Sequence, residues 1–325
     1  MKKTYAAVVL GVAALAATHG AIAADAAAWP SQPVKLVVPW AAGGTVDFSA
    51  RQLAQQLSTQ TGNTFLVENK PGAGGTIGTN YVAKASPDGY TVLVFEASYA
   101  TLPGLYAKLP WDHAKDLAPV GGIISTPMAL VVPRNSPFNS VRDLIDYAHS
   151  HPGKLNFGSG GYGSTPHMTA EVFKRDAKVD ITHIPYKGGG EALLAVMSGN
   201  ADLLFTAVPT ALPHVGQGKI KILALSGAHR LKALPDIPTV AESGVPGFVV
   251  DNWYGVAVPR GTPAAIIDKL HGMLGQAFAD RAMAERFVQQ GAEITLSTPQ
   301  QFGKLVQAET QRWTEVSRAA GLKPE

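Results

Sequence analysis

Short apolar runs followed by helix-like spacing recur along this chain. Residues 34–39 form such a run, and residues 47–60 then place apolar side chains at helical intervals. Residues 64–68 precede a glycine-rich turn and a second helical pattern at 76–85, and residues 90–95 form a third apolar run. Strands that alternate with helices in this way are typical of an α/β protein with a parallel sheet.

The same alternation continues to the end of the chain. Ser140 and Asp143 have the spacing of a capping box, which predicts a helix from there to about residue 150. Gly199 and Asn200 favour the end of a helix, and Thr262 with Pro263 favours the start of one. The other predicted strands cover residues 128–133, 155–158, 181–185, 203–206, 220–225 and 254–259. The other predicted helices cover residues 166–175, 191–198, 263–280, 282–290 and 299–320.

Two stretches of the chain resemble each other. VVPRNSP at 131–137 and AVPRGTP at 257–263 both run from a predicted strand into a predicted helix start. Such an internal repeat favours two similar α/β lobes, with the chain crossing between them near residues 130 and 255. A chance recurrence of Val-Pro at strand ends is the alternative.

The first residues have the pattern of a secretory signal peptide. Lys2 and Lys3 precede an apolar run at 6–17, and Ala21 and Ala23 fit a small-residue cleavage site. A membrane anchor is the alternative, but the run is shorter than the roughly 20 residues that span a bilayer. We therefore expect cleavage after Ala23 and a periplasmic protein of about 300 residues, enough for two domains.

Composition removes several classes of function. Without Lys2 and Lys3 the chain has 25 basic and 24 acidic residues, which argues against a nucleic-acid partner. It has no cysteine, so disulfides, thiolate nucleophiles and cysteine metal ligands are excluded. With 46% apolar residues it can be stable by its core alone.

Three glycine-rich turns lie between predicted strands and helices. They cover residues 41–47, 69–78 and 158–165, and they contain the hydroxyl residues Thr45, Thr76, Ser164 and Thr165. The first turn of a helix has unpaired N–H groups and a partial positive charge, and glycine lets a ligand approach the backbone closely. The turns therefore predict a site for a carboxylate or a phosphate that needs no cationic side chain.

Familiar catalytic and cofactor motifs fit poorly. A dinucleotide fingerprint in the second turn would need glycine where Ile77 stands. A hydrolase could be built from Ser164, His167 and some aspartate, but Ser164 at a helix start is better explained as a cap. The histidines are scattered, and His149 and His151 suit a helix end rather than a metal. We expect no catalytic residue, no cofactor and no metal.

Aromatic side chains near the predicted strand ends could enclose the body of a ligand. They are Trp40, Tyr99, Tyr162, Trp253 and Tyr254. Each could equally be an ordinary core residue. Lys187 is either a charge partner for a ligand or a solvated lysine in its loop.

Several motifs in fixed order resemble one family, the Bug-type substrate-binding proteins of tripartite tricarboxylate transporters. The stretches that carry the resemblance are PWAAGGTVDFSAR, VENKPGAGGTIG, SPDGYTVL, NFGSGGYGSTPHMTAEVFK, IPYKGGGEAL, LPDIPTVAESGVPGF and WYGVAVPRGTP. The resemblance spans nearly the whole chain after residue 23. It implies a two-lobed periplasmic binding protein of type II, with two parallel-rich sheets, flanking helices and a two-strand hinge. Lobe 1 would comprise residues 24–127 and 250–325, and lobe 2 residues 128–249.

The resemblance also implies a small carboxylate ligand between the lobes and permease subunits as membrane partners of a monomeric receptor. In the family one carboxylate is held by the first two strand-to-helix loops, partly through water. The ligand-binding residues expected here are Trp40, Ala42, Gly44, Thr45, Asp47, Ala73, Gly74, Gly75, Thr76, Ser98, Ser159, Tyr162, Thr165, His167, Thr206 and Asp251.

This chain departs from the usual pattern in ways that bear on the ligand. Trp40 stands where phenylalanine is more common, and Tyr162 where a small polar residue is frequent; residues 205–212 lack the usual Asp or Asn. These changes favour a mono- or dicarboxylate with an apolar or aromatic body over citrate. We expect Asp47 to cap the first helix or brace its loop without meeting the ligand's charge. An exported α/β enzyme and a sensor-type receptor remain the alternatives.

Overall fold

The computed structural model describes residues 28–322 and residue 324. The signal peptide expected at 1–23 lies outside these residues. Strand β4 (Leu117–Pro133) is 17 residues long and divides its pairing between two sets of strands. Residues 117–127 pair with β9 (Asp251–Pro259), whereas Met128–Pro133 pair with β7 (Leu203–Ala207) and β8 (Ile220–Leu225). We call the two sets of elements lobe 1 and lobe 2.

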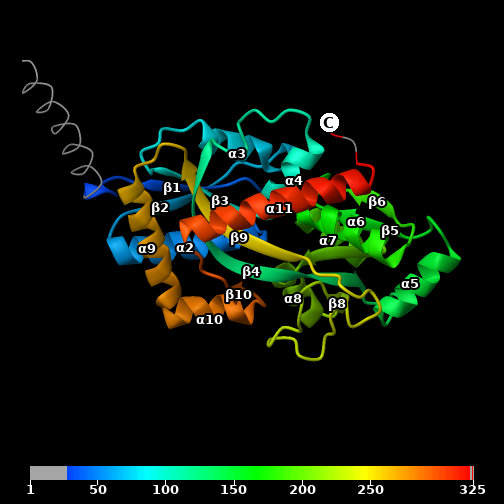
Figure 1. The fold of residues 1–325 in the computed structure, drawn as a ribbon. Coiled ribbons are helices and arrows are strands. Elements are labelled where there is room, and N and C mark those ends of the chain that lie inside the picture. Colours follow the sequence, from blue (N-terminus) through cyan, green and yellow to red (C-terminus); the bar gives the residue numbers. More distant parts are fainter. Residues whose placement is uncertain (1–27, 323, 325) are drawn as a thin grey trace, which may run out of the picture.

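Lobe 1 contains both ends of the described chain (Figure 1). Its sheet orders the strands β2-β1-β3-β9-β4, with β10 also on β4. The other strands are β1 (Val34–Val38), β2 (Phe65–Asn69), β3 (Thr91–Glu96) and β10 (Glu293–Ile294). The helices are α2 (Thr45–Thr61), the 3₁₀ turn η1 (Ala73–Gly75), α3 (Thr76–Ala83), α4 (Ser98–Leu105), α9 (Ala264–Ala279), α10 (Arg281–Gln289) and α11 (Pro299–Ala319).

Lobe 2 is formed by the middle of the chain. Its strands continue from β4 in the order β7-β5-β6, with β8 also on β4. The remaining strands are β5 (Asn156–Ser159) and β6 (Thr182–Pro185). The helices are α5 (Val141–Ser150), α6 (Thr165–Ala177), α7 (Gly189–Ser198) and α8 (Val208–Gly216).

The parallel pairing expected from the sequence lies at the two ends of the molecule. β1 pairs parallel with β2 and β3, and β5 pairs parallel with β6 and β7, whereas the pairings of β4 and β9 are antiparallel. Parallel strands place their carboxyl ends at one edge of a sheet, so the helices that follow them begin at the same edge. This arrangement brings the starts of α2, α3 and α6 toward the junction between the lobes.

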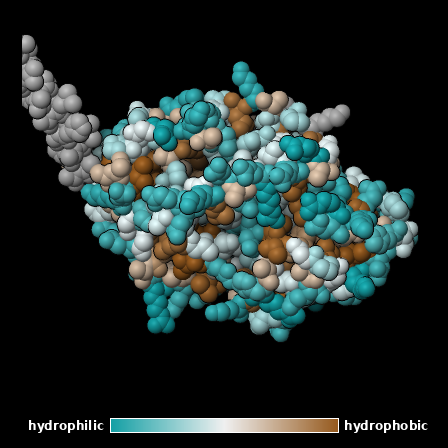
Figure 2. Space-filling model, in the orientation of Figure 1, coloured by the Kyte–Doolittle hydropathy of each residue, from teal (hydrophilic) through white to brown (hydrophobic). Residues whose placement is uncertain are grey.

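The apolar periodicity seen in the sequence becomes buried on the faces that it predicted. Val34, Leu36 and Val38 of β1 pack with Leu53 and Leu57 of α2, all less than 2% exposed. A second cluster runs through both lobes. It includes Phe95 and Trp313 of lobe 1 and Phe157, Phe173 and Phe205 of lobe 2. Figure 2 shows a mostly polar surface, with apolar side chains in small separate groups.

Several element boundaries expected from the sequence were wrong. The strand predicted at 128–133 begins eleven residues earlier, at Leu117, and its register against β9 shifts between Pro119 and Gly121 and between Gly122 and Ile124. The helix predicted to be capped by Thr262 begins at Ala264 with Pro263 as its N-cap residue, and the Thr262 hydroxyl donates instead to the Pro259 carbonyl. Helices α4 and α8 were not predicted.

Other local predictions were confirmed. Ser140 and Asp143 form the expected capping box at the start of α5, and Gly199 ends α7 in the left-handed conformation. Ser164 is the N-cap residue of α6, and its hydroxyl accepts a hydrogen bond from the His167 amide.

Candidate functional site

The loop from β1 to α2 is braced by one aspartate. The Asp47 carboxylate accepts hydrogen bonds from the Gly43 amide (3.0 Å), Arg51 Nε (2.9 Å) and Asn69 Nδ2 (2.9 Å). The same Asn69 nitrogen donates to the Trp40 carbonyl at 3.0 Å. The N-cap residue of α2 is Gly44, and no side chain forms a capping hydrogen bond at this helix start. Of the two roles predicted for Asp47, the structure therefore shows the brace and not the cap.

These contacts also keep Asp47 ionised and turned toward its own loop. Burial acts to raise the pKa of Asp47, but the hydrogen bonds from Arg51, Gly43 and Asn69 outweigh burial, and the pKa lies below its usual value. All the partners of its carboxylate belong to lobe 1. Gly43 and Gly44 are exposed on the open side of the loop. A Cβ atom added to either glycine would have no neighbouring atom within 4 Å.

The second glycine turn meets lobe 2 directly. Gly74 and Gly75 adopt positive φ angles of 62° and 91° before α3 begins at Thr76. A Cβ on Gly74 would lie 3.7 Å from the backbone oxygen of Tyr162, and one on Gly75 would lie 3.6 Å from the Trp40 ring. Two turns that are 88 residues apart in sequence therefore face each other across the junction of the lobes.

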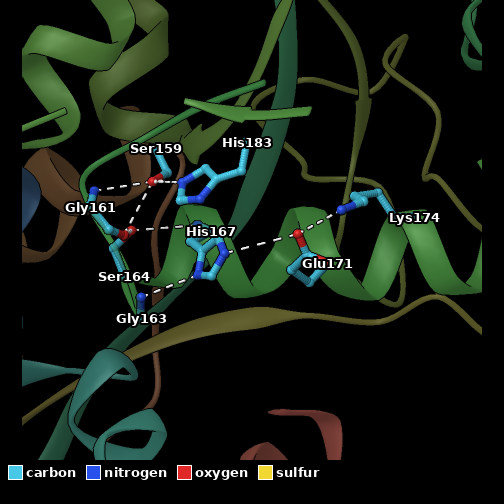
Figure 3. Close-up of polar contacts among 8 residues, drawn as sticks. All are labelled: Ser159, Gly161, Gly163, Ser164, His167, Glu171, Lys174 and His183. Atoms are coloured by element: carbon cyan, nitrogen blue, oxygen red, sulfur yellow. Dashed lines mark hydrogen bonds and ion pairs between the residues drawn. The ribbon is translucent and has the colours of Figure 1, made fainter. Parts of the chain in front are cut away.

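The third turn, between β5 and α6, is held by buried polar groups (Figure 3). Ser159 Oγ accepts from the Gly161 amide at 3.0 Å and lies 2.7 Å from His183 Nε2. The Ser164 hydroxyl donates to the Gly161 carbonyl at 2.7 Å. In the same turn, the Gly163 amide donates a hydrogen bond to His167 Nδ1 at 3.1 Å.

Two stacked histidines support this turn in their neutral form. The rings of His167 and His183 are 4.1 Å apart, and Phe157 stacks on His183 at 4.8 Å. Burial lowers the pKa of His167 to about 3, helped by His183 and Lys174, and burial lowers the pKa of His183 to about 4. Because the Gly163 amide donates to Nδ1 of His167, the proton of that ring sits on Nε2, 3.9 Å from Glu171.

The hydrolase alternative finds no support in this geometry. Ser164 is used as a helix cap, and His167 is engaged by a backbone amide rather than by Ser164 Oγ. The closer pair, Ser159 with His183, could not be recognised from local sequence patterns, because the two residues are 24 positions apart. The Ser159 hydroxyl is engaged by the Gly161 backbone and by His183, which gives it a structural role in the turn.

A chain of hydrogen bonds joins the starts of helices from both lobes. Thr45 Oγ1, at the start of α2, lies 3.1 Å from Thr210 Oγ1 of α8 in lobe 2. The Thr45 hydroxyl also hydrogen-bonds Tyr254. The Tyr254 hydroxyl in turn accepts from Asn252 Nδ2 at 2.9 Å, and both residues lie on β9 and are buried.

The chain of hydrogen bonds ends on Glu96, the last residue of β3. The Glu96 carboxyl receives hydrogen bonds from the Asn252 side chain and from the hydroxyl and amide of Ser98, the first residue of α4. From lobe 2, Thr165 Oγ1 donates to Glu96 Oε2 at 2.7 Å. Thr45, Ser98 and Thr165, all predicted from the sequence, are thus brought together, and Glu96, Asn252 and Thr210 were missed.

Burial dominates the electrostatics of this network. It raises the pKa of the Glu96 carboxyl above its usual value, although the hydrogen bonds from Ser98, Thr165 and Asn252 act in the opposite direction. Burial, with a contribution from Glu96, raises the pKa of Tyr254 well above its usual range. The Tyr254 phenol is therefore neutral at neutral pH.

Other predicted residues lie outside this network. Asp251 has Glu293, His229, Arg312 and Glu309 as its charged neighbours, and burial raises the pKa of its carboxyl. Its neighbour in sequence, Asn252, points to the opposite face of β9, as alternation along a strand requires.

The remaining predicted residues take simpler positions. Thr206 is buried in β7, Ala42 and Ala73 are exposed in their turns, and Lys187 is exposed beside α7.

Two of the aromatic residues considered as ligand contacts are core residues. Trp253 packs edge-to-face on Phe95 and Phe302. Tyr99 stacks on His113 at 4.1 Å, and its hydroxyl donates to the His113 carbonyl. Tyr99 lines a cavity of about 470 Å³ on lobe 1, together with residues of β4, β9 and α11.

Two further features are absent from the residues that the structure describes. No group of three or more His, Asp or Glu side chains lies close enough together to hold a metal ion. No helix in residues 28–322 has the length and apolar character needed to cross a bilayer.

The fold and the site define a class of protein: a two-lobed α/β solute receptor whose helix starts face one another between the lobes. The chain belongs to the family described as the tripartite tricarboxylate transporter family receptor, whose model matches residues 49–322. It is 34% identical over 297 residues to the protein BugT of Bordetella pertussis, which covers 91% of each chain. Members of this family are periplasmic substrate-binding receptors and not enzymes.

Solved structures agree with this assignment. A protein of R. palustris solved with adipate is 36% identical and superimposes with a TM-score of 0.88, covering 91% of this chain and all of that one. MatC of Rhodopseudomonas palustris, solved with bound malate, is 33% identical with a TM-score of 0.83, covering 89% of this chain and 99% of its own. The periplasmic binding protein BugD is 34% identical with a TM-score of 0.86, covering 91% of this chain and all of its own.

Proposed function

We propose that this receptor binds a small mono- or dicarboxylate with an apolar or aromatic body between its lobes. The carboxylate is held by backbone amides and hydroxyls at the helix starts, in the loops 41–47 and 72–76 of lobe 1 and around Ser159–His167 of lobe 2. The observation that carries the proposal is the convergence of these starts, linked across the lobes by Thr45 with Thr210 and by Thr165 with Glu96.

The chemistry of the helix starts favours an anion. Amides in the first turn of a helix have no acceptor within the helix, and the partial positive charge there attracts a carboxylate. Gly44 leaves the backbone open at the start of α2, and Gly74 and Gly75 provide the positive φ angles of the turn that opens α3. The adipate and malate bound by two similar proteins support the choice of a carboxylate over a phosphate.

Two aromatic residues support an apolar or aromatic ligand body. The Trp40 ring lies beside Gly75 at the second turn, and the backbone of Tyr162 lies beside Gly74 from the opposite lobe, with the Tyr162 ring 5.2 Å from the His167 ring. A flat body held between the two turns would lie beside the Trp40 ring and the Tyr162 residue while its carboxylate meets the amides.

The proposal includes export and delivery. Residues 1–23 act as a signal peptide that is removed after Ala23, and the monomeric receptor works in the periplasm. A ligand between the lobes favours the closed arrangement, and that closed form is presented to the permease subunits of a tripartite tricarboxylate transporter. The lobes are residues 24–127 with 250–325, and residues 128–249, joined where β4 changes partners.

A thermal-shift screen tests the ligand class. Mono-, di- and tricarboxylates with aliphatic and aromatic bodies are compared with the neutral amides of the same acids as matched controls. A ligand at a hundred times its dissociation constant adds about 2.7 kcal/mol to the free energy of unfolding, which gives a clear rise in melting temperature. We expect aromatic or apolar acids to raise the melting temperature and their amides to have no effect. Tight citrate binding with no response to aromatic acids would overturn the proposed ligand body.

A further inference from the structure

One acidic side chain lies where the helix starts of the two lobes meet. Glu96 is 6% exposed at the end of β3, and its hydrogen-bond donors are Thr165 of lobe 2 and Ser98 and Asn252 of lobe 1. All of these donors are uncharged. Among the ion pairs formed by the described residues, none includes Glu96.

The donors indicate that the carboxyl group acts as an acceptor. The Ser98 amide and the Asn252 side-chain nitrogen carry only N–H groups toward it, and such groups cannot accept a proton from a neutral acid. The opening of α4 also places its positive end at Glu96. The junction of the lobes therefore combines helix starts that attract an anion with one group that attracts a hydrogen-bond donor or a cation.

The hydrogen bond between Thr165 and Glu96 limits where a ligand can bind near Glu96. Thr165 Oγ1 lies 2.7 Å from Glu96 Oε2, which leaves no room for a ligand atom between them. A ligand carboxylate that lies beside this bond faces the acceptor oxygens of Glu96 in a poorly screened environment, and it is repelled strongly there when Glu96 is ionised. A ligand that takes the place of the Thr165 hydroxyl must donate a hydrogen bond itself, because a buried acceptor without a donor is destabilising. Both arrangements favour a donor on the ligand.

We infer that Glu96 is a specificity residue of this site and selects acids that carry a hydrogen-bond donor near the carboxylate, with an ammonium group as the best donor. This inference rests on the proposed function and narrows its ligand class to amino acids and, more weakly, hydroxy acids. Acids without a donor bind more weakly in either position. Beside the Thr165–Glu96 bond their carboxylate faces the Glu96 carboxyl, and in place of the Thr165 hydroxyl they leave Glu96 without that hydrogen bond.

Series of acids that differ only in the donor test this inference by isothermal titration calorimetry. One series is 3-phenylpropionate, 3-phenyllactate and phenylalanine; the others are succinate, malate and aspartate, and adipate with 2-aminoadipate. The wild-type protein is compared with Glu96→Gln, which keeps the size of the side chain and removes its charge. Glu309→Gln is the control, because Glu309 is also largely buried but pairs with Arg312 and Trp313 on α11.

In any series that binds, we expect the amino acid to bind the wild type at least about tenfold more tightly than the acid without a donor, or about 1.4 kcal/mol. Glu96→Gln should bring this ratio close to one, and Glu309→Gln should keep the wild-type ratio. Equal or tighter binding of the donor-free acid by the wild type would overturn the inference while leaving the proposed function intact. An unchanged ratio in Glu96→Gln would overturn it too. If the variant does not fold, the wild-type ratios decide the question. Failure of every acid in every series to bind would contradict the proposed function itself.

Discussion

Lowering the pH should destabilise the turn between β5 and α6 through its two neutral histidines. Burial lowers the pKa of His167 from 6.5 to about 3 and that of His183 to about 4. The unfolded chain gains protons on these rings as the pH falls below 6.5, whereas the folded protein does not. Stability is therefore present above pH 6.5 and is lost as the pH falls, until the folded rings are themselves protonated near pH 3 to 4.

The size of the loss follows from the two pKa values. At pH 5.0 each ring lowers the free energy of unfolding by about 2 kcal/mol relative to neutral pH, and less for His183 because it is partly exposed. A structural consequence accompanies it. A second proton on His167 would have to occupy Nδ1, which accepts the Gly163 amide, so protonation would break that hydrogen bond.

Urea denaturation at pH 7.5 and pH 5.0 measures this effect. The variant His167→Asn keeps an acceptor near the position of Nδ1 but cannot gain a proton, and His149→Gln on the exposed face of α5 is the control. The wild type should lose about 2 kcal/mol more than His167→Asn between the two pH values, and the control should behave as the wild type. Parallel losses in the wild type and His167→Asn would refute the reasoning.

Three further substitutions follow from the structure. Asp47→Ala removes the brace of the β1–α2 loop and should weaken the binding of every ligand and lower the melting temperature; unchanged values of both would contradict this. Tyr162→Ala should change the order of ligand preference in calorimetry more than it changes stability, and an equal loss for all ligands would count against a contact with the ligand body. Gly255→Ala would place a Cβ 1.9 Å from the buried Phe302 ring, so urea denaturation should show a loss of at least about 2 kcal/mol; a loss below 0.5 kcal/mol would mean that α11 moves freely.

Local patterns in the sequence were enough to find the helix starts. Glycine followed by a hydroxyl residue predicted the openings of α2, α3 and α6, because caps and positive φ angles depend on neighbouring residues. The same reasoning found Ser164 as a cap. Neighbouring residues in the sequence are therefore sufficient to locate Thr45, Thr76 and Thr165 at helix starts.

The network that joins the lobes could not be found in this way. Glu96 and Thr165 are 69 residues apart, and Thr45 and Thr210 are 165 apart, so only the folded chain brings them together. Glu96 itself follows an apolar run and carries no local motif that marks it as buried.

Tertiary packing also explains the helices that were missed. Helix α4 contains Pro103 and Gly104, which disfavour a helix in isolation. It forms because it packs against α11, where a Cβ on Gly104 would lie 2.9 Å from Ser317 Oγ. Helix α8 contains Pro213 and lies against β4, β7 and β8. In both cases contacts with distant elements outweigh the local preference.

The central claim is that backbone amides and hydroxyls at the helix starts hold the ligand's carboxylate between the lobes. A crystal structure with the acid that most raises the melting temperature tests it most directly. We predict carboxylate oxygens within hydrogen-bond distance of amides in residues 41–47 or 72–76. A carboxylate bound chiefly by an arginine or lysine side chain, or an acid lying outside the junction of the lobes, would contradict the claim.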